Sequence, residues 1–129
     1  MLPAPIAPAP QTLYGFAGST VVANFAFTRA DSQGVQQPIN LTGASIWMTV
    51  KVRQTDPDPG VAQLTIGAGI VVTSATGGLA TAMIDNDTTA TLDAPANLYY
   101  DVKVLESSGV YSTPIFGTLV LNAPITVAS

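Results

Sequence analysis

The chain has 129 residues, which suits one domain with its own core, and it carries a net charge of −4. Histidine and cysteine are both absent, which removes the commonest general base, the best nucleophile and any disulfide, so we expect a protein that is not an enzyme and needs no metal or cofactor. The four basic residues form no run, which argues against a nucleic-acid partner, and no apolar stretch could span a membrane, which argues against a membrane partner. Only 9% of the residues are charged, which fits a surface partly covered by neighbouring subunits.

The N-terminal residues differ in composition from the rest of the chain. Prolines at positions 3, 5, 8 and 10 favour an extended polyproline II arm, which we place at residues 1–15, before a folded domain at residues 16–129. Leu2 and Ile6 are apolar side chains on this arm that would gain from burial against a neighbour. The arm is either a passive tail or a strap along another subunit, and in both cases we expect it to add nothing to the core.

From Ser19 onward the pattern is that of β-strands separated by turns. Apolar and polar residues alternate in about seven segments, at turn intervals typical of an antiparallel β-sandwich. The segments cover residues 21–28, 44–53, 61–66, 70–73, 79–84, 98–105 and 111–121. The side chains predicted to share the core are Phe25, Phe27, Leu41, Ile46, Met48, Val50, Leu98, Tyr100, Val102 and Leu119.

Two acidic clusters could suggest a metal site. Asp85-Asn86-Asp87 precedes a threonine-rich stretch, and we interpret it as one helical turn capped by Asn86 or Asp87. A calcium loop would need a glycine and a closing glutamate, which this stretch lacks. Asp56 and Asp58 each precede a proline, which is typical of a rigid surface loop.

Aromatic side chains are the better candidates for binding. Tyrosine and tryptophan are enriched at interfaces, and Trp47 falls on the polar side of its strand although it is the only tryptophan. Together with the two apolar residues of the arm, the predicted partner-binding residues are Leu2, Ile6, Tyr14, Phe16, Trp47, Tyr99 and Tyr111. Sugars also stack on exposed tryptophan and tyrosine, so the partner is either a protein or a carbohydrate.

Several short motifs follow one another in an order and spacing that point to one family. They are Phe25-x-Phe27-Thr28 before Asp31-x-x-Gly34, the sequence PINLTGA at 38–44 before the strand at 46–52, DTTATL at 87–92, YYDVKV at 99–104 and GTLVL at 117–121. Across residues 16–123 the chain resembles the immunoglobulin-like family of tailed phages that includes the N-terminal domain of the baseplate upper protein.

The resemblance implies an immunoglobulin-like β-sandwich and a structural role in a virion, with other virion proteins and copies of the chain itself as partners. Domains of this family dock receptor-binding fibres onto a baseplate or tail, so attachment at the tail or baseplate is the first expectation. This chain has no long stalk region after the sandwich and begins with the proline-rich arm, which raises capsid decoration as an alternative. A carbohydrate-binding module that faces a host-surface glycan is the third expectation.

Overall fold

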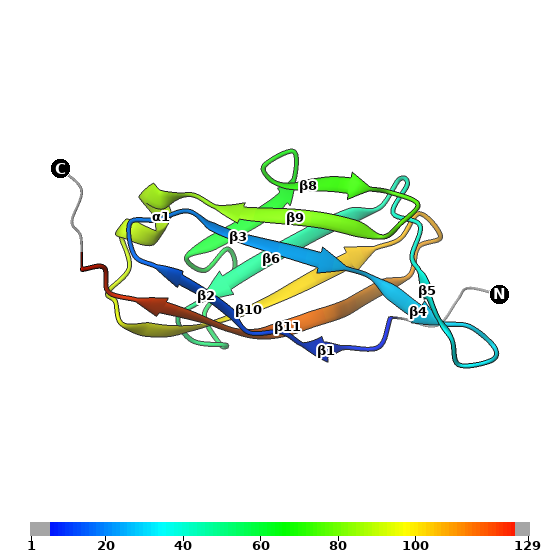
Figure 1. Ribbon diagram of the computed structural model, residues 1–129, viewed down its shortest axis with the longest axis horizontal. Coiled ribbons are helices and arrows are strands. Elements are labelled where there is room, and N and C mark those ends of the chain that lie inside the picture. The colour runs from blue at the N-terminus through cyan, green and yellow to red at the C-terminus, as the bar shows by residue number, and fades with distance from the viewer. Residues whose placement is uncertain (1–5, 126–129) are drawn as a thin grey trace.

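Buried and exposed side chains alternate strictly along β3 (Val21–Ala26) and along most of β10 (Ala96–Leu105). The computed structural model describes residues 6–125 and has an all-β architecture with one short helix (Figure 1), which confirms the all-β prediction. The other elements are β1 (Ala9–Pro10), β2 (Leu13–Phe16), β4 (Thr28–Ala30), β5 (Gln36–Pro38), β6 (Ser45–Lys51), β7 (Ala62–Ile66), β8 (Gly69–Ser74), β9 (Leu79–Ile84), α1 (Asn86–Ala90) and β11 (Tyr111–Asn122).

The strands form one long, curled, mixed sheet and a small ribbon. The sheet has nine strands in the order β1-β11-β10-β6-β7-β8-β9-β3, with β2 also paired to β11, and β4 pairs with β5 in the ribbon. Figure 1 shows α1 at one end of the sheet and the ribbon at the other. The seven predicted segments correspond to β3 and to β6–β11. The predicted number of strands is too low because β1, β2, β4 and β5 have only two to four residues each, too few to reveal an alternation.

Curling of the sheet brings the inner faces of its two halves onto one core. One half contains β11, β10 and β6, the other contains β8, β9 and β3, and a short parallel pairing of β7 with β8 joins them. Every side chain that the alternation predicts for the core is at most 4% exposed, so that prediction is confirmed. Leu41 reaches the core from the loop before β6, and Gly43 turns the chain there with a φ of 74°.

The N-terminal segment packs against the sheet from the first described residue and joins it at β1. Ile6 is 4% exposed, and its N–H donates a hydrogen bond to Ser112 Oγ at 2.8 Å. β1 and β2 both pair in parallel with β11, and Leu13 is also buried in the core. The expectation that residues up to 15 stay apart from the core is therefore wrong for the described part of the arm, and the predicted boundary at residue 16 cuts through β2. The prolines hid this segment because they allow an edge strand while weakening every sequence signal for one.

Two neighbours on β10 and β11 hold this segment in place. The hydroxyl of Tyr100 donates a hydrogen bond to the carbonyl oxygen of Gln11, and burial raises the pKa of Tyr100 to about 12, which keeps the donor protonated. Gly117 lies against the same carbonyl group, and a Cβ at this position would come within 2.2 Å of the Gln11 oxygen. The chain can pass this closely only because residue 117 is a glycine.

The acidic stretch before α1 caps the helix, as predicted, but through a different residue. Asp85 Oδ1 accepts a hydrogen bond from the N–H of Thr88 at 2.8 Å, so Asp85 is the N-cap, rather than Asn86 or Asp87. Hydrogen bonds from Thr88 hold the pKa of Asp85 below its usual value, because they favour the ionised carboxylate.

Candidate functional site

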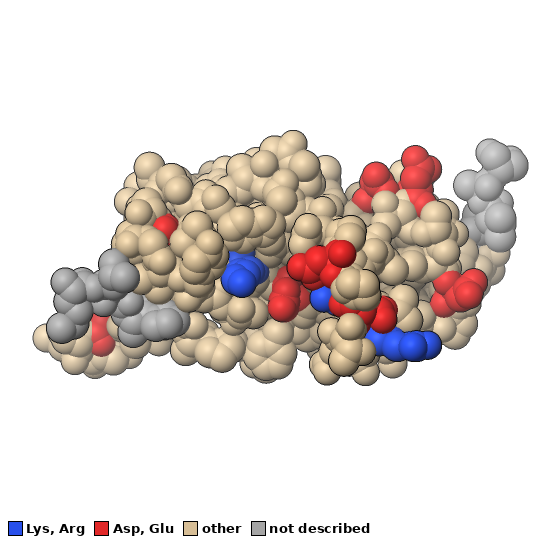
Figure 2. Space-filling view, turned by 180° about the vertical axis from the view of Figure 1, so that it is seen from behind, with Lys and Arg blue, Asp and Glu red and all other residues tan. Residues whose placement is uncertain are grey.

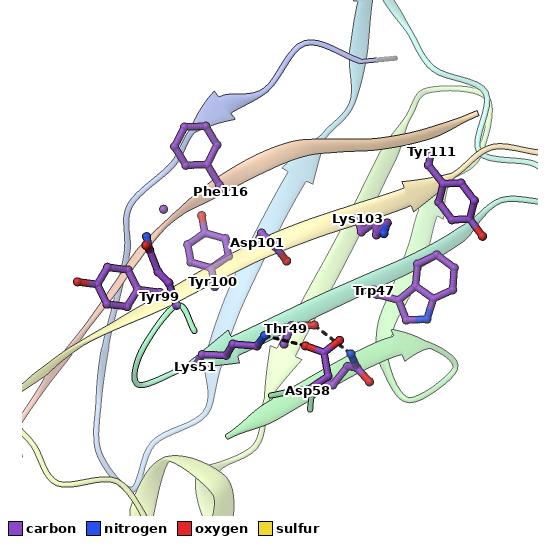
Figure 3. A pocket seen from close by; sticks show the side chains of 13 residues that line it. Trp47, Thr49, Lys51, Asp58, Tyr99, Tyr100, Asp101, Lys103, Tyr111 and Phe116 are labelled. Carbon is purple, nitrogen blue, oxygen red and sulfur yellow. Dashed lines mark hydrogen bonds and ion pairs between the residues drawn. The ribbon is translucent and has the colours of Figure 1, made fainter. Parts of the chain in front are cut away.

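The predicted aromatic residues gather on one outer face of the sheet. Trp47 on β6, Tyr99 on β10 and Tyr111 on β11 line a single cleft of about 630 Å³, together with Phe116 on β11. We call this hollow, between Trp47, Tyr99, Tyr111 and Phe116, the ring cleft. Figure 3 shows the four rings around a floor of shorter polar side chains.

Strand register explains why the rings surround a hollow. On the outer faces of β6 and β10, Trp47 lies opposite Lys103, Thr49 opposite Asp101, and Lys51 opposite Tyr99. Each end of the array therefore has a large ring beside a long ammonium side chain, while the middle has two short polar groups. The difference in side-chain length leaves the middle of the array open.

The charges of the ring cleft are largely paired with groups inside it. Lys51 Nζ lies 2.8 Å from Asp58 Oδ1, and the hydrogen bond and charge of Lys51 hold the pKa of Asp58 below its usual value. Lys103 Nζ lies 5.1 Å from the centroid of the Tyr111 ring, a cation–π distance. Figure 2 shows acidic and basic side chains side by side over the middle of one surface, with only acidic side chains toward its two ends.

Asp101 is the carboxylate at the centre of the floor. Desolvation within the cleft raises its pKa above the usual value, and the ammonium groups of Lys51 and Lys103 oppose that shift only in part. Beside it, Gln63 Nε2 donates a hydrogen bond to Thr49 Oγ1 at 3.1 Å. The floor thus offers amide, hydroxyl, carboxylate and ammonium groups within one hollow.

The remaining predicted partner-binding residues lie outside the ring cleft. Tyr14 and Phe16 stand on β2 and are 71% and 50% exposed, paired with Val120 and Asn122 on the same outer face. Ile6 packs into the core of its own chain, which corrects the prediction that this side chain is offered to a neighbour. Leu2 lies outside the described residues.

Sequence reasoning named only three rings of the site and missed Phe116 and all of its polar members, which include Thr49, Lys51, Asp58, Gln63, Asp101 and Lys103. Phe116 could have been found by counting outward positions back from the buried Leu119. The same count places Tyr111 inside, yet Tyr111 is exposed because an irregularity between the pairs Val102–Ile115 and Val104–Ser112 adds a residue to β11. Asp58 belongs to the loop between β6 and β7, so only the folded chain brings it to the cleft.

No protein-family model matches the sequence, and no curated protein matches it. The resemblance to the phage family therefore stays a prediction. Within residues 6–125, no three potential metal ligands cluster, and no helix has the length and apolarity needed to cross a bilayer.

Proposed function

We propose that this chain is a non-enzymatic attachment module of a phage particle. It docks on other virion subunits, at the tail or baseplate, and on copies of itself, and it presents the ring cleft to a binding partner. The observation that carries the proposal is the ring cleft, because rings this exposed cost free energy in water unless something covers them. Tyr111 is 55% exposed, Phe116 44% and Tyr99 42%.

Strand order supports an immunoglobulin-like sandwich as the scaffold. Such domains of the variable type place strands C, F and G in one sheet and strands B, E and D in the other. In this chain β6, β10 and β11 neighbour one another in the order C-F-G, while β3, β9 and β8 follow the order B-E-D. The chain has no cysteine pair, and its tryptophan lies on the outer side of the strand that corresponds to C.

A second exposed area of the same outer face supports a module with two contacts. Tyr14 and Phe16 project from β2, outside the ring cleft, and are the most exposed rings of the described chain apart from Tyr111. A module that joins two bodies needs two contact areas, and Tyr14 and Phe16 do not line the cleft. We assign Tyr14 and Phe16 to contacts with other virion subunits, and the ring cleft to the partner that is being attached.

Particle fractionation combined with quantitative mass spectrometry tests the proposal. We expect the protein at low copy number in tail fractions of the phage that encodes it, and we expect the double variant Tyr14→Ala, Phe16→Ala to be depleted there. Val22→Ala, at an exposed position on the opposite outer face, is the matched control. High copy number on isolated heads would instead establish capsid decoration, and absence from every particle fraction would refute a virion role.

A further inference from the structure

The hydrogen-bonding groups of the ring cleft are balanced in charge. Two basic residues, Lys51 and Lys103, and two acidic residues, Asp58 and Asp101, line it. A cleft with this balance does not attract a strongly charged ligand, since it has no excess of either sign to complement. The balance points to a neutral ligand.

The same groups match the needs of hydroxyl groups. A hydroxyl both donates and accepts hydrogen bonds, so a ligand rich in hydroxyls needs donors and acceptors side by side. Lys103 and Gln63 supply donors in the cleft, and the Asp101 carboxylate supplies acceptors. The rings add flat apolar faces of partial negative charge, on which the C–H face of a pyranose ring can stack.

The position of the cleft argues against an extended peptide as its occupant. Peptides commonly bind a sheet by adding a strand to a free edge, where main-chain groups are unpaired. The ring cleft lies over β10, which is paired with β6 on one side and with β11 on the other. Its main-chain groups are engaged on both sides, so binding there depends on side chains alone.

We propose that the ring cleft binds a neutral glycan chain. Trp47 and Tyr99 are the stacking platforms at its two ends, and Asp101 is the central hydrogen-bond acceptor. This assignment rests on the proposed function, because it names the partner to which the module attaches.

Trp47 makes the assignment directly testable. It is the only tryptophan of the chain and it lines the cleft, so tryptophan fluorescence, excited where tyrosine does not absorb, reports on that site. The purified full chain is titrated with neutral oligosaccharides of glucose, galactose and N-acetylglucosamine, and with sialylated and sulfated oligosaccharides as charged counterparts. We expect a saturable fluorescence change with at least one neutral oligosaccharide and a weaker response to its charged counterpart.

Variants separate stacking from a general effect on the fold. Tyr99→Ala should weaken binding by about tenfold, the equivalent of one lost aromatic contact, while Val22→Ala, on the opposite outer face, should leave it unchanged. Asp101→Asn preserves the shape of the side chain and should also weaken binding. Urea unfolding of each variant checks that the fold is intact.

Three results would overturn the assignment: no neutral oligosaccharide binds, the charged forms bind better, or Tyr99→Ala binds as tightly as the natural chain. The proposed function is judged separately by particle fractionation. A chain found in tails that binds no glycan refutes only the glycan, and a chain that binds glycan but is absent from particles refutes only the virion role.

Discussion

The two outer faces of the curled sheet follow the same alternation but carry different chemistry. The face over β6, β10 and β11 mixes rings with charges around a hollow. The opposite face, over β3, β8 and β9, comes from strands without a single charged residue. Large apolar side chains stand exposed on this aliphatic face: Val71 at 61%, Val22 at 54% and Met83 at 50%.

The difference in chemistry between the two faces shows that outward positions accept a wider range of side chains than buried positions do. Alternation determines which positions are buried, and a core position accepts few side chains. An outward position accepts many, so its chemistry reflects what the surface is for. On the aliphatic face the outward polar groups satisfy each other, as when Thr81 Oγ1 donates to Asn24 Oδ1 at 2.9 Å. On the ring-cleft face the outward polar groups are also paired, as Lys51 is with Asp58, but they surround a hollow.

Phe27→Ala should have the largest effect, because it breaks the core on which both faces rest. Phe27 is 1% exposed, and its truncation should lower the free energy of unfolding by about 3–5 kcal/mol. Urea denaturation followed by circular dichroism measures it. A loss below about 1 kcal/mol would mean that the inward register of this segment is wrong.

Gly117→Ala should disturb the ring-cleft face while sparing the other. The added Cβ meets the Gln11 carbonyl oxygen at 2.2 Å, so the segment before β2 must move, at a cost of about 1–3 kcal/mol. Hydrogen exchange should increase in β1 and β2 and stay unchanged in β8 and β9. Thr118→Ala is the neighbouring control, and equal effects of the two variants would contradict the close passage of Gln11.

Asp101→Asn should change the pH dependence of stability. The pKa of Asp101 is raised in the folded chain, so the folded state binds this proton more tightly than the unfolded state does. Stability from this group is greatest below its ordinary pKa of 3.8 and is lost as the pH rises through the raised value. As the pH rises across that window, the melting temperature of the natural chain should therefore fall relative to that of the variant. A difference that stays constant with pH would contradict the desolvation of Asp101.

Val71→Ala should have the smallest effect. The side chain is 61% exposed on the aliphatic face, so stability should change by no more than about 0.5 kcal/mol, and glycan titration should be unaffected. Thermal melting and the tryptophan titration check the two statements. A large loss of either would show that the aliphatic face is coupled to the ring cleft.

Alternation predicted the core and the long strands, because each buried position there is fixed by its neighbours two residues away. It could not predict β1 and β2, whose parallel pairing with β11 depends on residues about a hundred positions distant. It identified Trp47 and Tyr99 as outward rings, yet it could not bring them together, since their distance depends on the register of β6 with β10. Tyr111 faces outward, as expected for a binding residue, only because the pairing of β11 with β10 is irregular, and a periodic pattern cannot predict such an irregularity.

The hydrogen bond from Ile6 to Ser112 joins residues 106 positions apart. During synthesis the first strands leave the ribosome long before β11 exists, so Ile6 and Leu13 cannot take their places in the core until β11 has emerged. Contacts of such long sequence separation slow folding, because the intervening chain must be ordered before they form. We therefore expect this domain to reach its native state only after β11 has been synthesised, with Ile6 and Leu13 among the last side chains to enter the core.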